Sequence, residues 1–235
     1  MESADFDRVP KERMQRSADR TSPAGEVVVV LVTAFGYLVL MSLAMAAGGR
    51  FVTGYKLDNA GAAGLILYEL VALAIVGTFL KSRGWTLRDF NPEISWRLTG
   101  AGVLLAAAIL AANWILAALF MAVGLIGAEA YGSVDAGGLG VALFTALCIV
   151  NPVFEETLVV GYVAEALRDR RPPLLAVNLS VSIRLLYHLY QGPAGVIAVV
   201  PAGLLFAFAY QRWNRLWPLV FAHSLLDALG ILNSR

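Results

Sequence analysis

Cysteine, histidine and concentrated charge are all scarce in this chain of 235 residues. The single cysteine, Cys148, excludes an internal disulfide framework, and its apolar surroundings indicate a small packing residue. A net charge of +1 excludes the strongly basic surface that nucleic-acid binding requires, so no such partner is predicted. Histidine occurs only twice, at His188 and His223. What the chain has in excess is apolar side chains, which make up 59% of it.

These apolar residues are gathered in long runs. The mean hydropathy is +0.70, and soluble domains are only roughly 45–50% apolar, so the composition indicates an integral membrane protein whose partner is the lipid bilayer. A helix needs about 20 apolar residues to cross the hydrocarbon core. The sequence therefore predicts an all-α fold, a polytopic membrane helix bundle of about seven transmembrane helices. The predicted spans are 27–47, 61–80, 98–124, 139–164, 173–191, 194–210 and 216–233.

Lysine and arginine alternate between the polar segments in a way that predicts orientation. The N-terminal tail and the segments after the second, fourth and sixth spans hold 14 of the 18 basic residues, whereas the alternate segments hold three. Positive charge accumulates on the cytoplasmic side of membrane proteins. The N-terminus is therefore expected in the cytoplasm, and the chain is expected to be a multi-pass protein of the plasma (cytoplasmic) membrane.

Three regions follow from this pattern. Residues 1–26 form a polar cytoplasmic tail that is predicted to be disordered. Residues 27–138 carry the N-terminal transmembrane helices. Residues 139–235 form a helical core that holds most of the polar side chains expected at membrane depth.

Those polar side chains are the sequence's main functional signal. They are Glu69, Glu155, Glu156, Arg184, His188, His223 and Asp227. A central charge costs roughly 2.5–3.5 kcal/mol on the insertion scale, so these groups are expected to face one another or a wet cavity. Arg184 and His188 are spaced i, i+4, as are His223 and Asp227, so each pair shares one helix face.

The two adjacent acids are expected to have different roles. Glu155 and Glu156 point about 100° apart on a helix, so one is expected to face the reacting centre and the other to support it. Pro152, in the Asn151-Pro152 dipeptide one turn earlier, removes a backbone donor and is expected to open room for water. Glu69 belongs to no motif and is predicted to be a protonated packing residue or a partner of Arg184, and not a catalytic residue.

Three stretches also carry a family resemblance. "NPVFEETLVVGY", "SIRLLYHLYQG" and "PLVFAHSLLDAL" resemble the three motifs of the CPBP (CAAX protease and bacteriocin-processing) family of intramembrane proteases, over roughly residues 139–233. Two positions depart from the family pattern. The family's arginine after the double glutamate is Val160 here, and its phenylalanine before the first histidine is Arg184. Our hypothesis is that the guanidinium has changed helices and that Arg184 pairs with Glu156; the alternative is that Arg184 reaches toward the membrane interface.

The resemblance implies an intramembrane endopeptidase that hydrolyses a peptide bond with an activated water. In this interpretation Glu155 is the general base, and His188 holds the same water. His223 stabilises the oxyanion, and Asp227 orients His223. The predicted catalytic residues are Glu155, Glu156, His188, His223, Asp227 and Arg184. The expected substrate is a membrane-associated or lipidated peptide or protein.

Two questions stay open at this point. One is whether Zn²⁺ is a cofactor, since Glu155, His188, His223 and Asp227 have the donor types of a zinc site with an open position for water. The other is whether the chain is an enzyme at all, because a non-catalytic membrane scaffold or a bacteriocin-immunity-type protein of the same fold is the alternative. A proton-coupled carrier is a further possibility, although no repeated halves are visible.

Overall fold

The structure, a computed structural model, describes residues 23–49, 57–125, 136, 138–168 and 173–232. This part of the chain is entirely helical and contains no strand. The α-helices are α2 (Pro23–Ala47), α3 (Asn59–Ser82), α4 (Trp96–Ala122), α5 (Val141–Glu155), α6 (Val163–Leu167), α7 (Pro173–His188), α8 (Gly192–Trp213) and α9 (Trp217–Leu232). A π-helical segment, η3 (Glu156–Tyr162), joins α5 to α6 without a break, so that seven helices result. Two 3₁₀ turns complete the described elements, η1 (Leu87–Phe90) and η4 (Leu189–Gln191).

The all-helical prediction and its seven helices are confirmed. Five of the helices, α2, α3, α4, the α5–η3–α6 rod and α8, are long and apolar enough to cross a membrane. With 16 residues each, α7 and α9 rise only about 24 Å, which is shorter than the predicted spans 173–191 and 216–233. Most of the predicted tail, residues 1–22, lies outside the described residues, and residues 23–26 form the first turn of α2.

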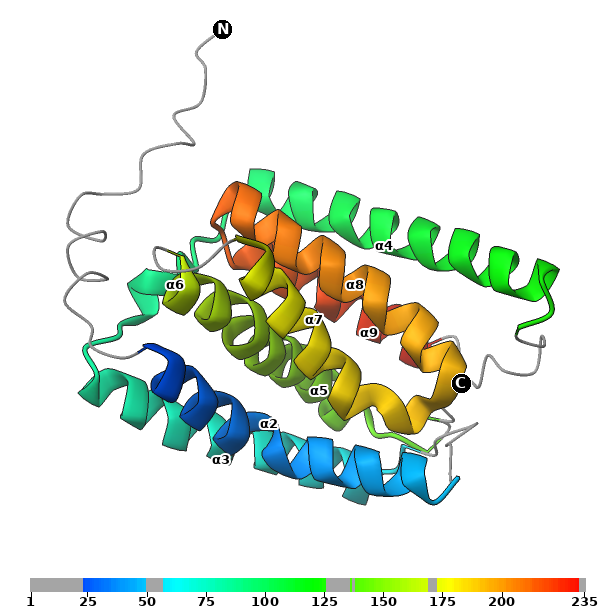
Figure 1. The fold of residues 1–235 in the computed structure, drawn as a ribbon, viewed down its shortest axis with the longest axis horizontal. Helices are drawn as coiled ribbons and strands as arrows, with labels where there is room; N and C mark the ends of the chain where they lie inside the picture. The colour runs from blue at the N-terminus through cyan, green and yellow to red at the C-terminus, as the bar shows by residue number, and fades with distance from the viewer. Residues whose placement is uncertain (1–22, 50–56, 126–135, 137, 169–172, 233–235) are drawn as a thin grey trace, which may run out of the picture.

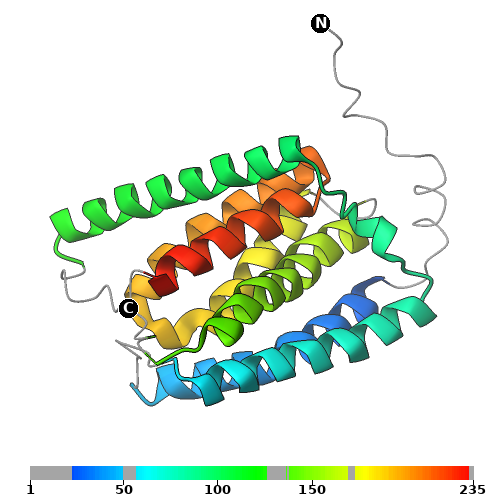
Figure 2. The same cartoon turned by 180° about the vertical axis from the view of Figure 1, so that it is seen from behind.

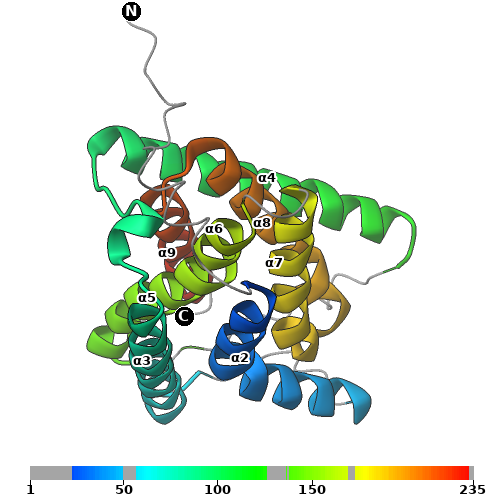
Figure 3. The same cartoon turned by 60° about the vertical axis from the view of Figure 1, so that its left-hand side comes forward.

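The helices are arranged around two central rods. In Figure 1, α7 and the α5–α6 rod lie between the α2/α3 pair and the α8/α9 pair, and α4 lies along the outside. The reverse view and the rotated view in Figures 2 and 3 show the same order. Packing follows it, since α2 packs on α7, α3 on α5, and α4 mainly on α9. The side chains of the two central rods can therefore be contacted from α2, α3, α8 and α9.

Close packing depends on small residues at specific helix crossings. A Cβ atom on Gly102 of α4 would stand 2.9 Å from the backbone oxygen of Pro218 and 3.1 Å from the ring of Phe221, both on α9. This glycine therefore allows the two helix backbones to approach more closely than any side chain permits. Without a hydrophobic driving force between helices in lipid, such close contacts are a main source of helix association.

A buried carboxylate fastens one end of the bundle. Glu26 in α2 accepts hydrogen bonds from Trp85 Nε1 at 2.8 Å and from Tyr162 Oη at 3.1 Å, and Arg83 Nε lies 3.0 Å from its other oxygen. Three separate parts of the chain meet at this carboxylate: the start of α2, the end of α3 and the π segment η3. The register of α2 against the central rod is therefore fixed at this end.

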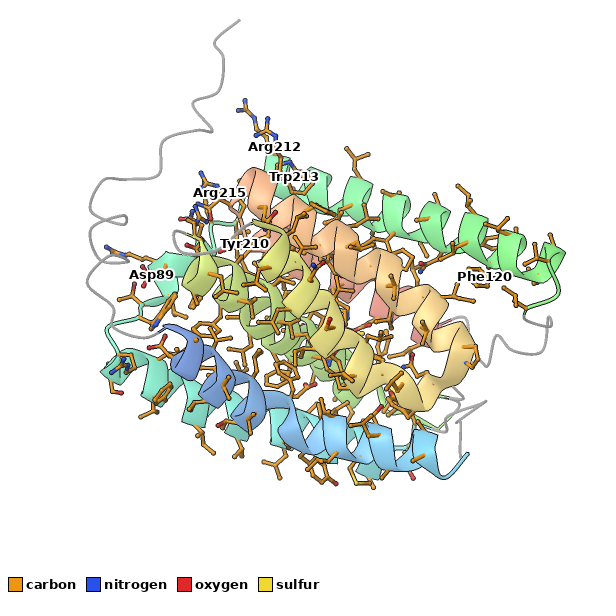
Figure 4. All side chains as sticks on the ribbon, viewed as in Figure 1. Asp89, Phe120, Tyr210, Arg212, Trp213 and Arg215 are labelled. Atoms are coloured by element: carbon orange, nitrogen blue, oxygen red, sulfur yellow. The ribbon has the colours of Figure 1, made fainter. Side chains whose placement is uncertain are left out.

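The same end collects the lysine and arginine side chains of the described residues, apart from the buried Arg184. Figures 1 and 4 show the ends of α3, α6 and α8 together with the starts of α4 and α9 at one end of the bundle, where Arg212 and Arg215 lie, whereas Phe120 lies toward the other end. The lysines and arginines at these helix ends and in the connections beside them are Lys81, Arg83, Arg88, Arg97, Arg168, Arg212 and Arg215. This is the side that the charge alternation in the sequence assigns to the cytoplasm.

Candidate active site

The two adjacent glutamates lie at a change of helix type. Glu155 is the last residue of α5, and Glu156 is the first residue of the π segment η3. Pro152, one turn earlier, lacks an N–H and so removes one hydrogen bond from the helix ladder. A π-helix is rare, and it occurs frequently at functional sites. The acidic pair thus stands where the backbone departs from regular α geometry.

Arg184 of α7 binds both acids. Its Nη1 lies 2.9 Å from Glu155 Oε2 and its Nη2 lies 2.7 Å from Glu156 Oε1. All three side chains are buried, and Arg184 is only 3% exposed, so the guanidinium does not reach toward the membrane interface. The Arg184–Glu156 pair predicted from the sequence is therefore present, and Glu155 joins it. A guanidinium between two carboxylates leaves one negative charge of the three groups uncompensated.

Glu155 has two further donors that the sequence did not single out. Tyr187 Oη donates to Glu155 Oε2 at 2.7 Å, and Asn151 Nδ2 donates to Glu155 Oε1 at 3.3 Å. The Tyr187 ring is stacked on Phe35 of α2 with ring centroids 5.1 Å apart, which holds the hydroxyl in place. The signal for both residues was their spacing, since Tyr187 follows Arg184 by three positions and Asn151 precedes Glu155 by four.

His223 on α9 approaches the same acids from the other side. Its Nδ1 lies 2.7 Å from Glu156 Oε1, the oxygen that also accepts from Arg184. Its Nε2 lies 3.5 Å from Asp227 Oδ1, one turn further along α9. The imidazole therefore has a carboxylate oxygen near each nitrogen, and Asp227 is placed to orient it. Phe206 of α8 packs against the ring at 5.7 Å between centroids.

His188 ends α7 with one nitrogen available. Its Nδ1 lies 3.0 Å from the backbone oxygen of Arg184, and a carbonyl can only accept, so Nδ1 carries a hydrogen and donates it. In the neutral ring Nε2 is then an acceptor, and no side chain or backbone group among the described residues is bonded to it. This nitrogen can hold a water molecule without losing an existing contact.

A cavity of about 310 Å³ brings these groups together, at the lower end of the roughly 300–1,000 Å³ range of ligand pockets. Glu155, His188, His223 and Asp227 line it, whereas Glu156 and Arg184 do not. The polar lining is completed by Glu69, Asn151, Tyr187 and Tyr190, and the apolar lining by Leu38, Leu57, Leu65, Leu147, Leu226, Gly230 and Ile231. Glu155 thus faces the cavity and Glu156 supports it from behind, which is the division predicted for an adjacent pair.

Of the two alternatives predicted for Glu69, the pairing with Arg184 is wrong. Glu69 is buried on α3 and lines the cavity, but its hydrogen-bonding partner is Asn151 Nδ2 at 2.7 Å rather than Arg184. Arg184 is already bound by Glu155 and Glu156 of the α5–η3–α6 rod. An acid from outside the predicted catalytic core therefore belongs to the wall of the site.

The residues that could hold a metal ion differ from the predicted ligands. Within the described residues, the group whose spacing could hold a metal ion is Glu155, Glu156 and His223, with ligand atoms within 4.8 Å of one another; the predicted set had His188 and Asp227 in place of Glu156. Arg184 already supplies a cation to both carboxylates of this group. A dication at the same place would be repelled by the guanidinium. The donors as arranged therefore do not fit a zinc site unless Arg184 moves.

Comparison with known proteins finds one family match, in the second part of the chain. Residues 137–229 match the family model described as "Type II CAAX prenyl endopeptidase Rce1-like". No curated protein and no solved structure matches the chain. The matched range contains all six predicted catalytic residues and runs from the start of the central rod into α9, whereas α2, α3 and α4 lie outside it.

Proposed function

Since residues 137–229 match the Rce1-like model of CAAX prenyl endopeptidases, we propose that the chain is an intramembrane endopeptidase whose nucleophile is a water activated by Glu155 and His188. The observation that carries the proposal is the shared cavity, which Glu155, His188 and His223 line from three different helices. The resemblance read from the three sequence motifs agrees with the family match.

The geometry supports a definite role for each oxygen of Glu155. Oε2 is held by Arg184 and Tyr187, so the carboxylate is fixed in orientation. Oε1 has only the long contact to Asn151 and is the oxygen available to a water. Glu155 takes a proton from that water while the water oxygen bonds to the substrate carbonyl carbon. The same proton then passes to the amine nitrogen as the carbon–nitrogen bond breaks.

His223 is suited to the developing oxyanion. Its Nδ1 is held by Glu156, and its Nε2 contact to Asp227 is long at 3.5 Å, so an N–H at this position can turn to a substrate oxygen. A donor fixed in a dry site before reaction costs little reorganisation when charge develops. Arg184 stays behind the acids and holds their charge. No step requires a metal, and we expect hydrolysis to persist in the presence of a chelator.

The proposal extends to topology and substrate. We propose that α7 and α9 cross the membrane with the five longer helices, that the N-terminus is cytoplasmic, and that the protein resides in the plasma (cytoplasmic) membrane. The leucine side chains of the cavity wall, together with the family's prenyl endopeptidase description, support a membrane-associated or lipidated peptide as substrate.

The test is cleavage by the purified protein in lipid nanodiscs. Prenylated and unprenylated membrane peptides are incubated with the wild type and with Glu155→Gln, with and without a chelator, and products are identified by mass spectrometry. We expect the wild type to cleave with or without chelator and the variant to lose at least about 10³-fold in kcat, as the general base and its electrostatic effect are removed together. Equal cleavage by a folded Glu155→Gln variant would favour the scaffold interpretation, with contamination as the source of activity.

A further inference from the structure

One carboxylate of the cavity comes from a helix that the family match does not include. Glu69 lies in the middle of α3, is 1% exposed and lines the same cavity as Glu155. The mechanism above does not use it. Because α3 packs directly on α5, the Glu69 side chain contacts the α5–η3–α6 rod from the N-terminal half of the protein.

A single amide connects Glu69 to the proposed general base. Asn151 Nδ2 donates to Glu69 Oε1 at 2.7 Å and to Glu155 Oε1 at 3.3 Å. In both contacts the amide nitrogen donates and a carboxyl oxygen accepts, so the nitrogen and not the oxygen of the amide faces the two acids. An amide nitrogen carries two hydrogens, and this arrangement assigns one to each carboxylate. The shorter bond, to Glu69, is the one that fixes the orientation of the amide.

The other oxygen of Glu69 indicates that the residue is not there for stability. Glu69 Oε2 is buried and has no hydrogen-bonding partner. An unsatisfied buried polar atom costs free energy, and an apolar side chain of similar shape would avoid the cost. Local departures of this kind are expected where function, rather than folding, selects the residue.

We infer that Glu69 is a positioning residue, which holds Asn151 so that its amide N–H, and not its oxygen, faces Oε1 of Glu155. This inference rests on the proposed function of Glu155. Without Glu69 the amide can rotate and present its oxygen to Glu155, which displaces or reorients the carboxylate that must contact water. The catalytic site is therefore completed by α3, outside the Rce1-like segment.

The first test separates positioning from packing. Glu69→Leu is expected to lower kcat about 10- to 100-fold, the range known for residues that orient the ligands of metal sites, with KM unchanged. Its thermal midpoint in nanodiscs should not fall, because the unsatisfied oxygen is removed as well. Glu69→Gln should stay within about threefold of the wild type, since its amide oxygen can still accept from Asn151. Glu26→Gln is the matched control and should leave kcat unchanged. Glu26 is a buried glutamate of α2 that contacts Arg83 just after α3, about 20 Å along α3 from Glu69.

The second test asks whether Glu69 acts through Asn151. Asn151→Leu should lower kcat by a factor similar to Glu69→Leu, and the double variant should be no slower than Asn151→Leu alone. Multiplicative losses in the double variant, full activity in Glu69→Leu, or a fall in its thermal midpoint matching its loss of kcat would each overturn the inference. A Glu69→Gln variant as slow as Glu69→Leu would also overturn the inference, because catalysis would then depend on the charge of Glu69 and not on its hydrogen-bond acceptor.

A third measurement does not depend on catalysis. Selective ¹⁵N labelling of asparagine, with Asn151→Leu to assign the signal, reports both side-chain amide hydrogens of Asn151. We expect both to be shifted downfield in the wild type and one to lose its shift in Glu69→Leu. An unchanged pair would contradict the inference even if no substrate were ever found. A changed pair together with a peptide-inactive wild type would instead reject the proposed function while leaving the contact intact.

Discussion

Arg184 is the residue on which the charge balance of the site depends. From α7 it binds two buried glutamates, whereas the motif pattern that the sequence resembles has its arginine on the helix of the glutamates. The position where that pattern has arginine is Val160, which is buried in the π segment. Stability and catalysis should therefore both respond to the position of a single guanidinium.

The exchange of Arg184 with Val160 tests this dependence. Arg184→Val leaves Glu155 and Glu156 without their cation and should cost about 3–5 kcal/mol of folding free energy, the typical cost of breaking a buried ion pair, and abolish cleavage. The double variant Arg184→Val/Val160→Arg should recover a large part of both. Thermal midpoints and peptide cleavage in nanodiscs measure the two effects. A folded but inactive double variant would show that the location of the guanidinium, and not only its charge, is required.

Tyr187 supports a second residue-scale prediction. Tyr187→Phe removes the 2.7 Å hydrogen bond to Glu155 but keeps the ring that stacks on Phe35. We expect kcat to fall about tenfold while stability changes by only about 1 kcal/mol, the usual net value of one hydrogen bond. Tyr210→Phe is the matched control, since its hydroxyl donates to Glu165 outside the cavity. A Tyr187→Phe enzyme with wild-type kcat would mean that Arg184 and Asn151 are enough to fix Glu155.

The sequence could identify the chemical groups of the site but not their full contacts. Glu155, Arg184 and His223 were identifiable because charged or imidazole side chains are costly in hydrocarbon. Asn151 and Tyr187 are less costly there and gave a weaker signal. The acceptor of Asn151 on α3 depends on how two helices are rotated about their axes, which apolar runs do not encode. For the same reason the sequence predicts metal ligands from donor types alone, and the group that the structure brings together contains Glu156 in place of His188 and Asp227.

At the scale of helices, the crossing of α4 and α9 sets the position of His223. Gly102 meets Pro218 and Phe221 on α9 within about 3 Å of where a Cβ would stand, and His223 follows two residues after Phe221. A side chain at this crossing must push the two backbones apart. The displacement would be carried directly to the imidazole.

Gly102→Ala should therefore weaken both folding and catalysis. We expect a loss of about 1–3 kcal/mol, the range for overpacking a tight contact, and a lower kcat, because α9 shifts relative to Glu156. Gly100→Ala is the control on the same helix, since a Cβ there meets nothing within 4 Å. Thermal midpoints and cleavage rates of the two variants measure the difference. Equal behaviour of the two would mean that α9 accommodates the added methyl without moving.

Helix ends were the less predictable part of the fold. The predicted span 139–164 corresponds to a rod that continues to Leu167 through a π segment, and the predicted span 173–191 ends its α-helix at His188. Apolar composition reports which residues can lie in lipid, but it does not report how the backbone is hydrogen-bonded. The π segment and the early end of α7 are features of backbone bonding, and both lie beside the acids and histidines of the site.

At the scale of the whole molecule, charge and architecture agree on one axis. The basic side chains of the described helix ends gather at the end of the bundle that holds Arg212 and Arg215 (Figure 4), and the positive-inside rule predicts that this end faces the cytoplasm. The buried Cys148 is the single cysteine, so its replacement by serine gives a background for site-specific labelling.

Labelling of introduced cysteines measures the orientation. In sealed right-side-out vesicles, Val123→Cys should react with a membrane-impermeant maleimide, whereas Arg212→Cys should react only after the vesicles are opened. Both positions are exposed, so a difference in reaction reflects the side of the membrane rather than burial. The reverse pattern would place the N-terminus outside, and reaction of both in sealed vesicles would mean that α4 and α8 do not both end as predicted.

The guanidinium of Arg184 also constrains the evolutionary history of this chain. Starting from a family pattern with arginine at the position of Val160, the substitutions at the two positions could have occurred in either order. An ancestor that lost the first arginine before gaining the second would have carried two buried acids with no cation, whereas one that gained first would have held a temporary surplus of positive charge. We therefore expect a chain with arginine at both positions to fold more readily than one with arginine at neither, because only the second leaves Glu155 and Glu156 without a cation.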